Sequence, residues 1–243
     1  MQDHDNTQSQ TLRAVLGLRG LIIDGLLAPG ARVAEPMIVE RFGVSRTPAR
    51  AALAQLAEEG LLERRETSGF AVKAYSAQDI FQAIEIRGTL EGLAARYAAE
   101  GTVPKALLMR MRACVAELDD VVGNLSADVD QSDYVRLNDA FHRLLIDASG
   151  SDMVARSLDR IKALPFAAPN AFVQSLALDH ASVKKVLIMA QEQHRAIVEA
   201  IAQGHGARAQ ALAHEHSFCA ARYLELLQAR DHAIPWVAAG TDG

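Results

Sequence analysis

The chain has 243 residues, half of them apolar, which is enough for two modest domains with hydrophobic cores. Its two cysteines, Cys114 and Cys219, are too few for a disulfide framework, and no N-terminal apolar run resembles a signal peptide or a membrane span. We therefore expect a cytoplasmic protein without membrane contact. The net charge of −5 argues against broad electrostatic adhesion to nucleic acid.

The charge is distributed unevenly along the chain. Residues 1–10 are polar, and we expect a disordered leader there. Residues 11–75 carry nine Lys and Arg against seven Asp and Glu, whereas residues 76–243 carry sixteen against twenty-one. A weakly basic segment before an acidic one is consistent with a domain that binds DNA at specific sites, attached to a second domain.

A tight turn separates two predicted helices in the basic segment. Pro36 suits the first position of a short helix that continues over residues 37–42, because the N–H that proline lacks would have no partner there. Gly43 and Val44 supply the turn, and Ser45 is a preferred N-cap for the next helix. This pattern is typical of a helix-turn-helix.

The second of these helices, which begins with the sequence SRTPARAAL, has two different faces. Arg46 and Arg50 lie one turn apart on one face. The other face carries an apolar stripe: Ala49, Ala52, Leu53 and Leu56. One face therefore packs, and the other presents cations, as the reading helix of a DNA-binding protein does. Isolated arginines would more often be solvated surface charges, but these arginines together with the helix-turn-helix pattern favour a helix that reads DNA.

A β-hairpin is predicted after this helix. Gly60 ends the helix, and residues 61–66 and 70–74 are strand-like. A turn of Thr67, Ser68 and Gly69 joins the two strands. The hairpin is a candidate wing.

The remainder of the chain is predicted to be helical. Ser76 or Asp79 can cap a helix that ends near Glu100, and Pro104 opens another. Amphipathic stretches follow at residues 131–149, 151–163, 181–203 and 206–231, with an irregular segment at 164–175 and a flexible tail at 233–243.

Three histidines point toward the predicted helical core. His142, His194 and His216 each share a helical face with apolar residues. His194 and His216 lie eleven residues before and after His205, which sits between two glycines, so an antiparallel hairpin about that turn would bring the two rings level. A lone imidazole on an apolar face is more often a hydrogen-bonded core residue than a metal ligand. The spacing favours a shared ligand.

Asn138 adds a fourth donor, because it precedes His142 by one helical turn. Four donor groups from three helices can converge inside a bundle, where metal sites are commonly built. His205 and His214 are expected at the surface.

Residues 11–75 resemble the winged helix-turn-helix of the GntR family of bacterial transcription regulators, including the segments at 28–33 and 58–62. The resemblance implies that Arg46 and Arg50 contact bases or adjacent phosphates and that Ser45 and Thr47 bind phosphate oxygens. It also implies that Gly69 lets the wing tip approach the minor groove. Some members have an arginine where this chain has Pro36, so one of their contacts is expected to be missing.

The second domain resembles the all-helical ligand-binding domain of the FadR branch of these regulators, called FCD. The matching segments are residues 85–99, 137–145, 192–204 and 214–218. The resemblance implies a divalent metal held by one aspartate and three histidines, which fall here on His142, His194 and His216. Asn138 occupies the aspartate position. Asp139 would point about 100° away around the helix and is not predicted to be a ligand.

The asparagine changes the charge of the expected site. Three neutral imidazoles, an amide and a divalent ion leave a net charge of about +2, so the site should attract an anion. We expect a small organic acid as effector, with Arg87 as a second cationic contact; a salt bridge from Arg87 to Glu91 is an equally good reading of that residue. Imidazole ligands favour zinc or nickel, and manganese or iron are alternatives.

The expected fold is mainly α: a winged helix-turn-helix of three helices and a β-hairpin wing over residues 11–75, a linker at 76–80, and an all-α FCD bundle over 81–232. The expected function is a ligand-responsive regulator, in the commoner arrangement a repressor, that binds a near-palindromic operator as a homodimer. The segment at 164–173 and the asparagine before Phe141 and His142 resemble the vanillate-responsive subgroup. Two alternatives are a metal-sensing regulator and a zinc-dependent hydrolase.

Overall fold

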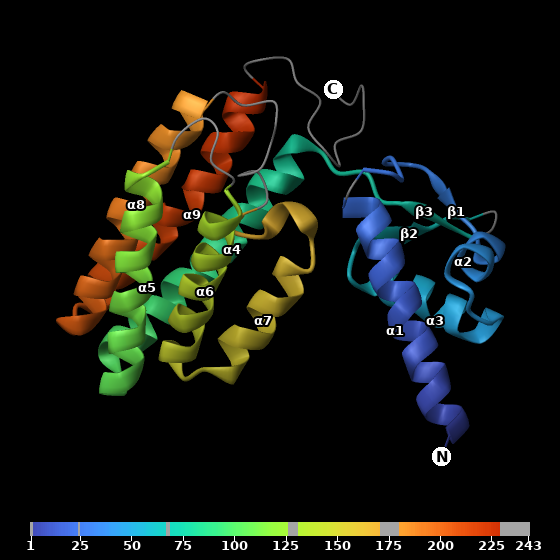
Figure 1. The fold of residues 1–243 in the computed structure, drawn as a ribbon, viewed down its shortest axis with the longest axis horizontal. Coiled ribbons are helices and arrows are strands. Elements are labelled where there is room, and N and C mark those ends of the chain that lie inside the picture. The colour runs from blue at the N-terminus through green and yellow to red at the C-terminus, as the bar shows by residue number, and fades with distance from the viewer. Residues whose placement is uncertain (1, 24, 67–68, 126–130, 171–179, 229–243) are drawn as a thin grey trace. The chain divides into compact units, whose positions relative to one another are not determined.

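A computed structural model describes residues 2–23, 25–66, 69–125, 131–170 and 180–228 (Figure 1). The described chain is mainly helical, as predicted, and its contacts divide it into two compact units with a boundary between Asp79 and Ile80. No helix in these ranges is both long and apolar enough to cross a membrane.

The first unit combines three helices with a small sheet. The helices are α1 (Gln2–Ile23), α2 (Glu35–Phe42) and α3 (Arg46–Glu58). Apolar side chains from all three helices and from the sheet form one core, which includes Leu18, Ile22, Ile38, Leu53, Leu56 and Leu62. The apolar stripe predicted on α3 therefore packs inward, which leaves its other face to solvent.

The sheet has three antiparallel strands in the order β1-β3-β2. The predicted hairpin is formed by β2 (Leu62–Arg64) and β3 (Phe70–Val72). A third strand, β1 (Arg32–Val33), pairs with the other edge of β3 and was not predicted. Two residues are too few to produce a recognisable alternation.

The turn between α2 and α3 follows the prediction closely. Gly43 has φ +59° and closes α2 in the left-handed region that glycine adopts at low cost. Ser45 occupies the N-cap position of α3, but its side chain makes no capping hydrogen bond. Its backbone N–H instead donates to Oε1 of Gln10, 3.0 Å away.

Two predicted boundaries are corrected. Helix α1 begins at Gln2, so the expected leader at residues 1–10 is largely helical; it contains neither glycine nor proline, and Thr11 Oγ1 donates back to the carbonyl of Thr7. The expected linker at 76–80 is shorter because the next helix begins at Ala77. The tail at 233–243 and the turn residues 67–68 lie outside the described residues.

The second unit is a bundle of long helices. They are α4 (Ala77–Glu100), α5 (Lys105–Gly123), α6 (Ser132–Ser149), α7 (Asp152–Lys162), α8 (His180–Ala202) and α9 (Gly206–Gln228), with a short 3-10 helix η1 at Pro165–Ala167. Helix α5 packs against α6 and α8, and α8 packs against α9 (Figure 1). All six predicted helices are present with small shifts at their ends.

Side chains close the first turn of α4. Ser76 Oγ accepts a hydrogen bond from the backbone N–H of Asp79 at 3.1 Å, and Asp79 Oδ2 accepts one from the backbone N–H of Ser76 at 2.9 Å. This reciprocal pair is a capping box, which satisfies two backbone donors that a helix start otherwise leaves without partners.

Two glycines let α4 approach α9 closely. A Cβ atom on Gly88 would lie 2.7 Å from the Cβ of Ser217, and one on Gly92 would lie 2.8 Å from the backbone oxygen of Gln210. A backbone oxygen within a helix cannot turn aside as a side chain can. The close contact of these helices therefore depends on glycine at both positions.

We expect Gly92→Ala to destabilise the second unit by about 1–2 kcal/mol, because overpacking should outweigh the better helix propensity of alanine. Gly123→Ala is the matched control, since its added methyl group would meet nothing within 4 Å. Thermal and urea unfolding at fixed metal concentration measure both changes. Equal stability of the two variants would contradict this account of the α4–α9 contact.

Candidate metal centre and nucleic-acid interface

Three buried histidines from three helices meet inside the second unit. His142 lies on α6, His194 on α8 and His216 on α9. The Nε2 atoms of His194 and His216 are 3.0 Å apart, and those of His216 and His142 are 3.4 Å apart. One ligand atom from each ring lies within 4.8 Å of the others. The meeting of His194 and His216 across the α8–α9 hairpin, which the spacing predicted, is confirmed.

The opposite nitrogen of each ring faces an oxygen atom. The pairs from Nδ1 to oxygen are His194 to Gln191 at 3.0 Å, His216 to Gln193 at 3.2 Å, and His142 to Glu91 at 3.0 Å. An acceptor at Nδ1 holds the ring proton there and leaves a lone pair on Nε2. Three lone pairs therefore point toward one small volume.

The direction of the Gln191 amide follows from its other partners. Its Nε2 donates to the backbone oxygen of Val115 at 2.9 Å and to Oδ1 of Asp119. Neither partner can donate, so the amide nitrogen of Gln191 must face them and its oxygen must face His194. Asp119 is held in turn by Arg195, whose Nη2 lies 2.7 Å from Oδ1. The network fixes the proton of His194 on Nδ1.

Burial keeps two of the rings neutral at ordinary pH. Burial, together with the neighbouring His216 and His142, lowers the pKa of His194 well below its usual value. Burial and the proximity of His142 lower the pKa of His216 to about 3. Both side chains are therefore in the deprotonated form that can bind a metal.

Arg87 and Glu91 form a buried ion pair on α4 beside these rings. Arg87 Nη1 lies 3.3 Å from Glu91 Oε2, and both side chains are at most 2% exposed. Burial alone would raise the pKa of Glu91, but the adjacent His142 and Arg87 lower it to about 2. The salt-bridge reading of Arg87 is confirmed, and its Nε atom remains buried without a hydrogen-bond partner among the described residues.

The orientation of Asn138 is set by Asn170. Asn170 Nδ2 donates to Asp139 Oδ1 at 2.7 Å and to the backbone oxygen of Val135 at 3.1 Å, so its own amide oxygen faces Asn138. Asn138 donates its Nδ2 to that oxygen at 2.9 Å. The Oδ1 atom of Asn138 is left buried without a partner in the described structure. Asp139, whose Oδ1 accepts from Asn170, is not part of the histidine group.

A small cavity of about 20 Å³ adjoins the rings of His142 and His216. Its polar lining includes Arg87, Asn138 and Tyr223, and apolar residues such as Leu187 complete the wall. Four buried polar atoms on this lining lack hydrogen-bond partners among the described residues: Arg87 Nε, Asn138 Oδ1, His142 Nδ1 and the Tyr223 hydroxyl. Buried polar atoms are costly to leave unpaired, so the lining is suited to a small polar ligand.

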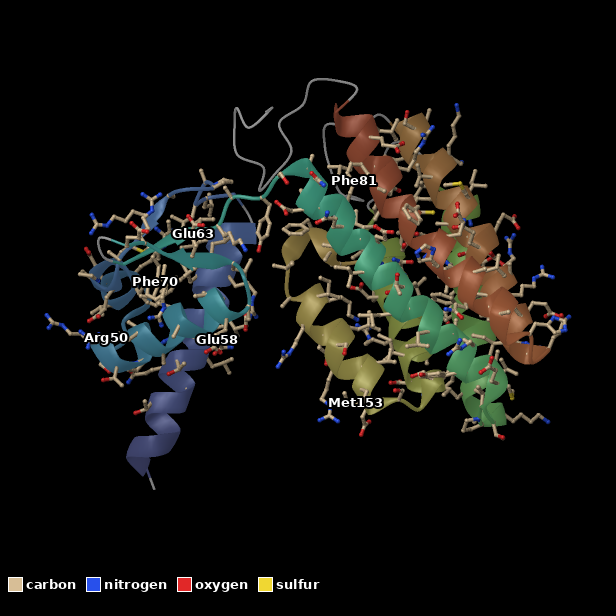
Figure 2. The ribbon with its side chains drawn as sticks, turned by 180° about the vertical axis from the view of Figure 1, so that it is seen from behind. Arg50, Glu58, Glu63, Phe70, Phe81 and Met153 are labelled. Atoms are coloured by element: carbon tan, nitrogen blue, oxygen red, sulfur yellow. The ribbon has the colours of Figure 1, made fainter. Side chains whose placement is uncertain are left out.

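The side chains predicted to contact DNA lie on the first unit. The side chain of Arg46 is 84% exposed and that of Arg50 is 72% exposed; Figure 2 shows Arg50 extending outward from α3. Ser45 and Thr47 are also exposed, at the start of the same helix. Gly69 belongs to the predicted wing turn, directly precedes β3, and has φ +84°. The helix start and the hairpin thus present the predicted side chains to solvent.

Glu35 lies between the two arginines and was not predicted. Its Oε2 accepts a hydrogen bond from Arg50 Nε at 2.5 Å, and its Oε1 lies 3.9 Å from Arg46 Nε. Pro36 directly follows it. A carboxylate therefore accompanies the predicted reading residues.

Sequence reasoning missed other supporting contacts for different reasons. Glu91 was predicted as the salt-bridge partner of Arg87 one turn away, but its contact with His142 was not. Gln191 lies three residues before its histidine, but amides at that spacing are common on helices. Asn170 gave no signal, since it comes from an irregular segment and contacts residues more than thirty positions away.

Comparison with known families matches both units. Residues 10–72 match the bacterial regulatory proteins of the gntR family, and residues 82–217 match the FCD domain. The transcriptional regulator YdhC of Bacillus subtilis is 29% identical over 147 residues, which cover 60% of this chain and 64% of that protein. The transcriptional repressor RspR of Escherichia coli is 28% identical over 189 residues, 78% of this chain and 77% of that protein.

Among solved structures, McbR/YncC of E. coli has the same fold, with a TM-score of 0.64 and 17% identity over 92% of this chain and 99% of that one. The matching relatives are regulators, which excludes the zinc-dependent hydrolase considered above. The chain belongs to the GntR family of bacterial transcription regulators and joins the family's DNA-binding domain to an FCD domain.

Proposed function

We propose that this regulator is a repressor whose FCD domain holds a divalent metal and releases operator DNA when a small carboxylate binds there. The observation that supports this best is the convergence of three Nε2 lone pairs from His142, His194 and His216. Lone pairs at these distances repel one another unless a cation lies among them. Each ring is also oriented from behind by an oxygen at Nδ1, as metal-binding histidines usually are.

The donor set fits a metal of intermediate softness. Three imidazole nitrogens are typical of zinc, and nickel is the next choice, with manganese and iron as alternatives. The Oδ1 atom of Asn138, left without a partner by Asn170, is the proposed fourth ligand. The metal would supply a fixed positive charge that attracts an anionic ligand atom.

The charge of the site supports a carboxylate effector. The rings of His194 and His216 and the Asn138 amide are neutral, and Arg87 is balanced by Glu91, so these groups do not compensate the charge of about +2 on the metal. Arg87 Nε and the Tyr223 hydroxyl are buried donors on the same cavity wall. They would stabilise the oxygens of a small acid, with Arg87 as the proposed effector contact.

For DNA, we propose that Arg46 and Arg50 read base edges, Ser45 and Thr47 bind phosphates, and Gly69 allows the wing to approach the minor groove. The high exposure of both arginines supports this, as does the exposed N-cap Ser45, whose side chain makes no capping hydrogen bond. A homodimer would place two such helices on a near-palindromic operator, in successive major-groove segments.

Arg46→Ala and Arg50→Ala should each weaken operator binding by about 1–3 kcal/mol, and the double variant should abolish it, with dimerisation and metal content unchanged. Arg112→Ala, at an exposed position of α5, is the control for loss of one positive charge. Fluorescence anisotropy with DNA selected by the wild-type protein gives the affinities. Wild-type affinity in the double variant would refute the assignment of the reading residues.

His194→Ala should lower zinc affinity by more than about a hundredfold, since it removes a direct ligand. His205→Ala is the control, because His205 is exposed at the turn before α9. Elemental analysis of purified protein and competition titration with a zinc chelator report the loss. If His194→Ala retains wild-type metal content, the proposed centre is wrong.

A thermal-shift screen of small organic acids on zinc-loaded protein should identify a stabilising ligand, which at one hundred times its Kd would contribute about 2.7 kcal/mol. The same ligand should lower operator affinity, whereas zinc alone should not change it. A change in operator affinity on adding zinc without any acid would instead identify a metal sensor.

A further inference from the structure

We propose that Glu35 is a positioning residue that sets the base preference of the reading helix by holding the guanidinium group of Arg50. This inference rests on the proposed role of Arg50 in reading DNA. The residue comes from α2, which does not itself carry the predicted reading side chains.

The contact occupies one defined edge of the guanidinium group. Arg50 Nε donates to Glu35 Oε2 at 2.5 Å, so the bond is made from the side of the arginine stem. The two Nη groups lie at the far end of the same plane. Arginine recognises guanine by donating two parallel hydrogen bonds to O6 and N7. A carboxylate on Nε therefore presents the Nη pair as the recognising fork.

Glu35 is better anchored than the arginine it contacts. Its side chain is 21% exposed, against 72% for Arg50. It is the first residue of α2, where the positive end of the helix dipole favours a carboxylate, and Pro36 fixes the backbone beside it. Immobilising Arg50 before DNA binds reduces the rotamer entropy that would otherwise be lost on recognition.

A hollow beside this pair leaves room for a base edge. Glu35 and Arg50 line it together with Leu53 of α3 and Phe70 of β3. Arg64 lies on the same lining, with its guanidinium carbon 5.4 Å from the centre of the Phe70 ring. The carboxylate of Glu35 thus lies with Arg50 and Arg64 on the surface predicted to bind DNA. Its negative charge there also weakens the attraction to DNA phosphates, whatever the base sequence.

Positioning and simple charge reduction predict different results. If Glu35 only lowers the positive potential, its removal strengthens binding to all DNA by the same factor. If it positions Arg50, its removal also reduces discrimination against a substituted guanine. Glu40 is the matched control, because it is an exposed glutamate on the same helix.

The experiment selects duplexes from a random library with wild-type protein and then measures affinities for the selected site, single-base variants and unrelated DNA. Glu35→Ala should lose about tenfold in discrimination at the guanine read by Arg50, within the range that one bidentate contact supplies. Glu35→Gln, which keeps an acceptor oxygen but not the charge, should lose less. Glu40→Ala should strengthen binding to unrelated DNA without changing base preference.

A double-mutant cycle tests whether Glu35 acts through Arg50. In the Arg50→Ala background, Glu35→Ala should cause no further loss of discrimination. Unchanged base preference in both Glu35 variants would overturn the positioning role and leave Arg50 as a reader. Unchanged base preference in Arg50→Ala would instead overturn the proposed function. If Glu35→Ala fails to fold, Glu35→Gln decides the question by the same measurement.

Discussion

Polar contacts at the Nδ1 atoms of the buried histidines connect most of the second unit. His142 on α6 faces Glu91 on α4, and His216 on α9 faces Gln193 on α8. Gln191, behind His194, is held by Val115 and Asp119 of α5. Five helices are therefore joined through polar contacts whose loss would leave buried groups unpaired, at about 1–3 kcal/mol each. The same contacts that orient the rings also constrain how the bundle can pack.

Local patterns in the sequence were sufficient for the helices and for part of the site. Apolar periodicity and cap residues predicted α4 to α9, and the symmetric spacing of His194 and His216 about a glycine turn predicted that these two side chains would meet. The two-residue strand β1 and the helical conformation of residues 2–10 were missed, since neither has a distinctive pattern. Pairings such as Gln191 with Asp119 and Asn138 with Asn170 could not be predicted, because they depend on which helices become neighbours.

The two units use the same pair of residue types in different surroundings. Arg87 and Glu91 are buried, so neither could lose its partner without leaving an uncompensated charge in the interior. Arg50 and Glu35 are a partly exposed pair, and water lowers both the strength of their attraction and the cost of separating them. The buried pair is thus a permanent part of the site, whereas the exposed pair can be separated at a lower cost.

Helix α4 runs without interruption from Ala77 to Glu100, with its first turn closed by Ser76 and Asp79. Glu91 lies fourteen residues from its start, which corresponds to about 21 Å along the axis. An unbroken helix of this length behaves as a stiff rod, because bending it would break backbone hydrogen bonds. A displacement of α4 near the histidines would therefore also move the start of the helix at Ala77.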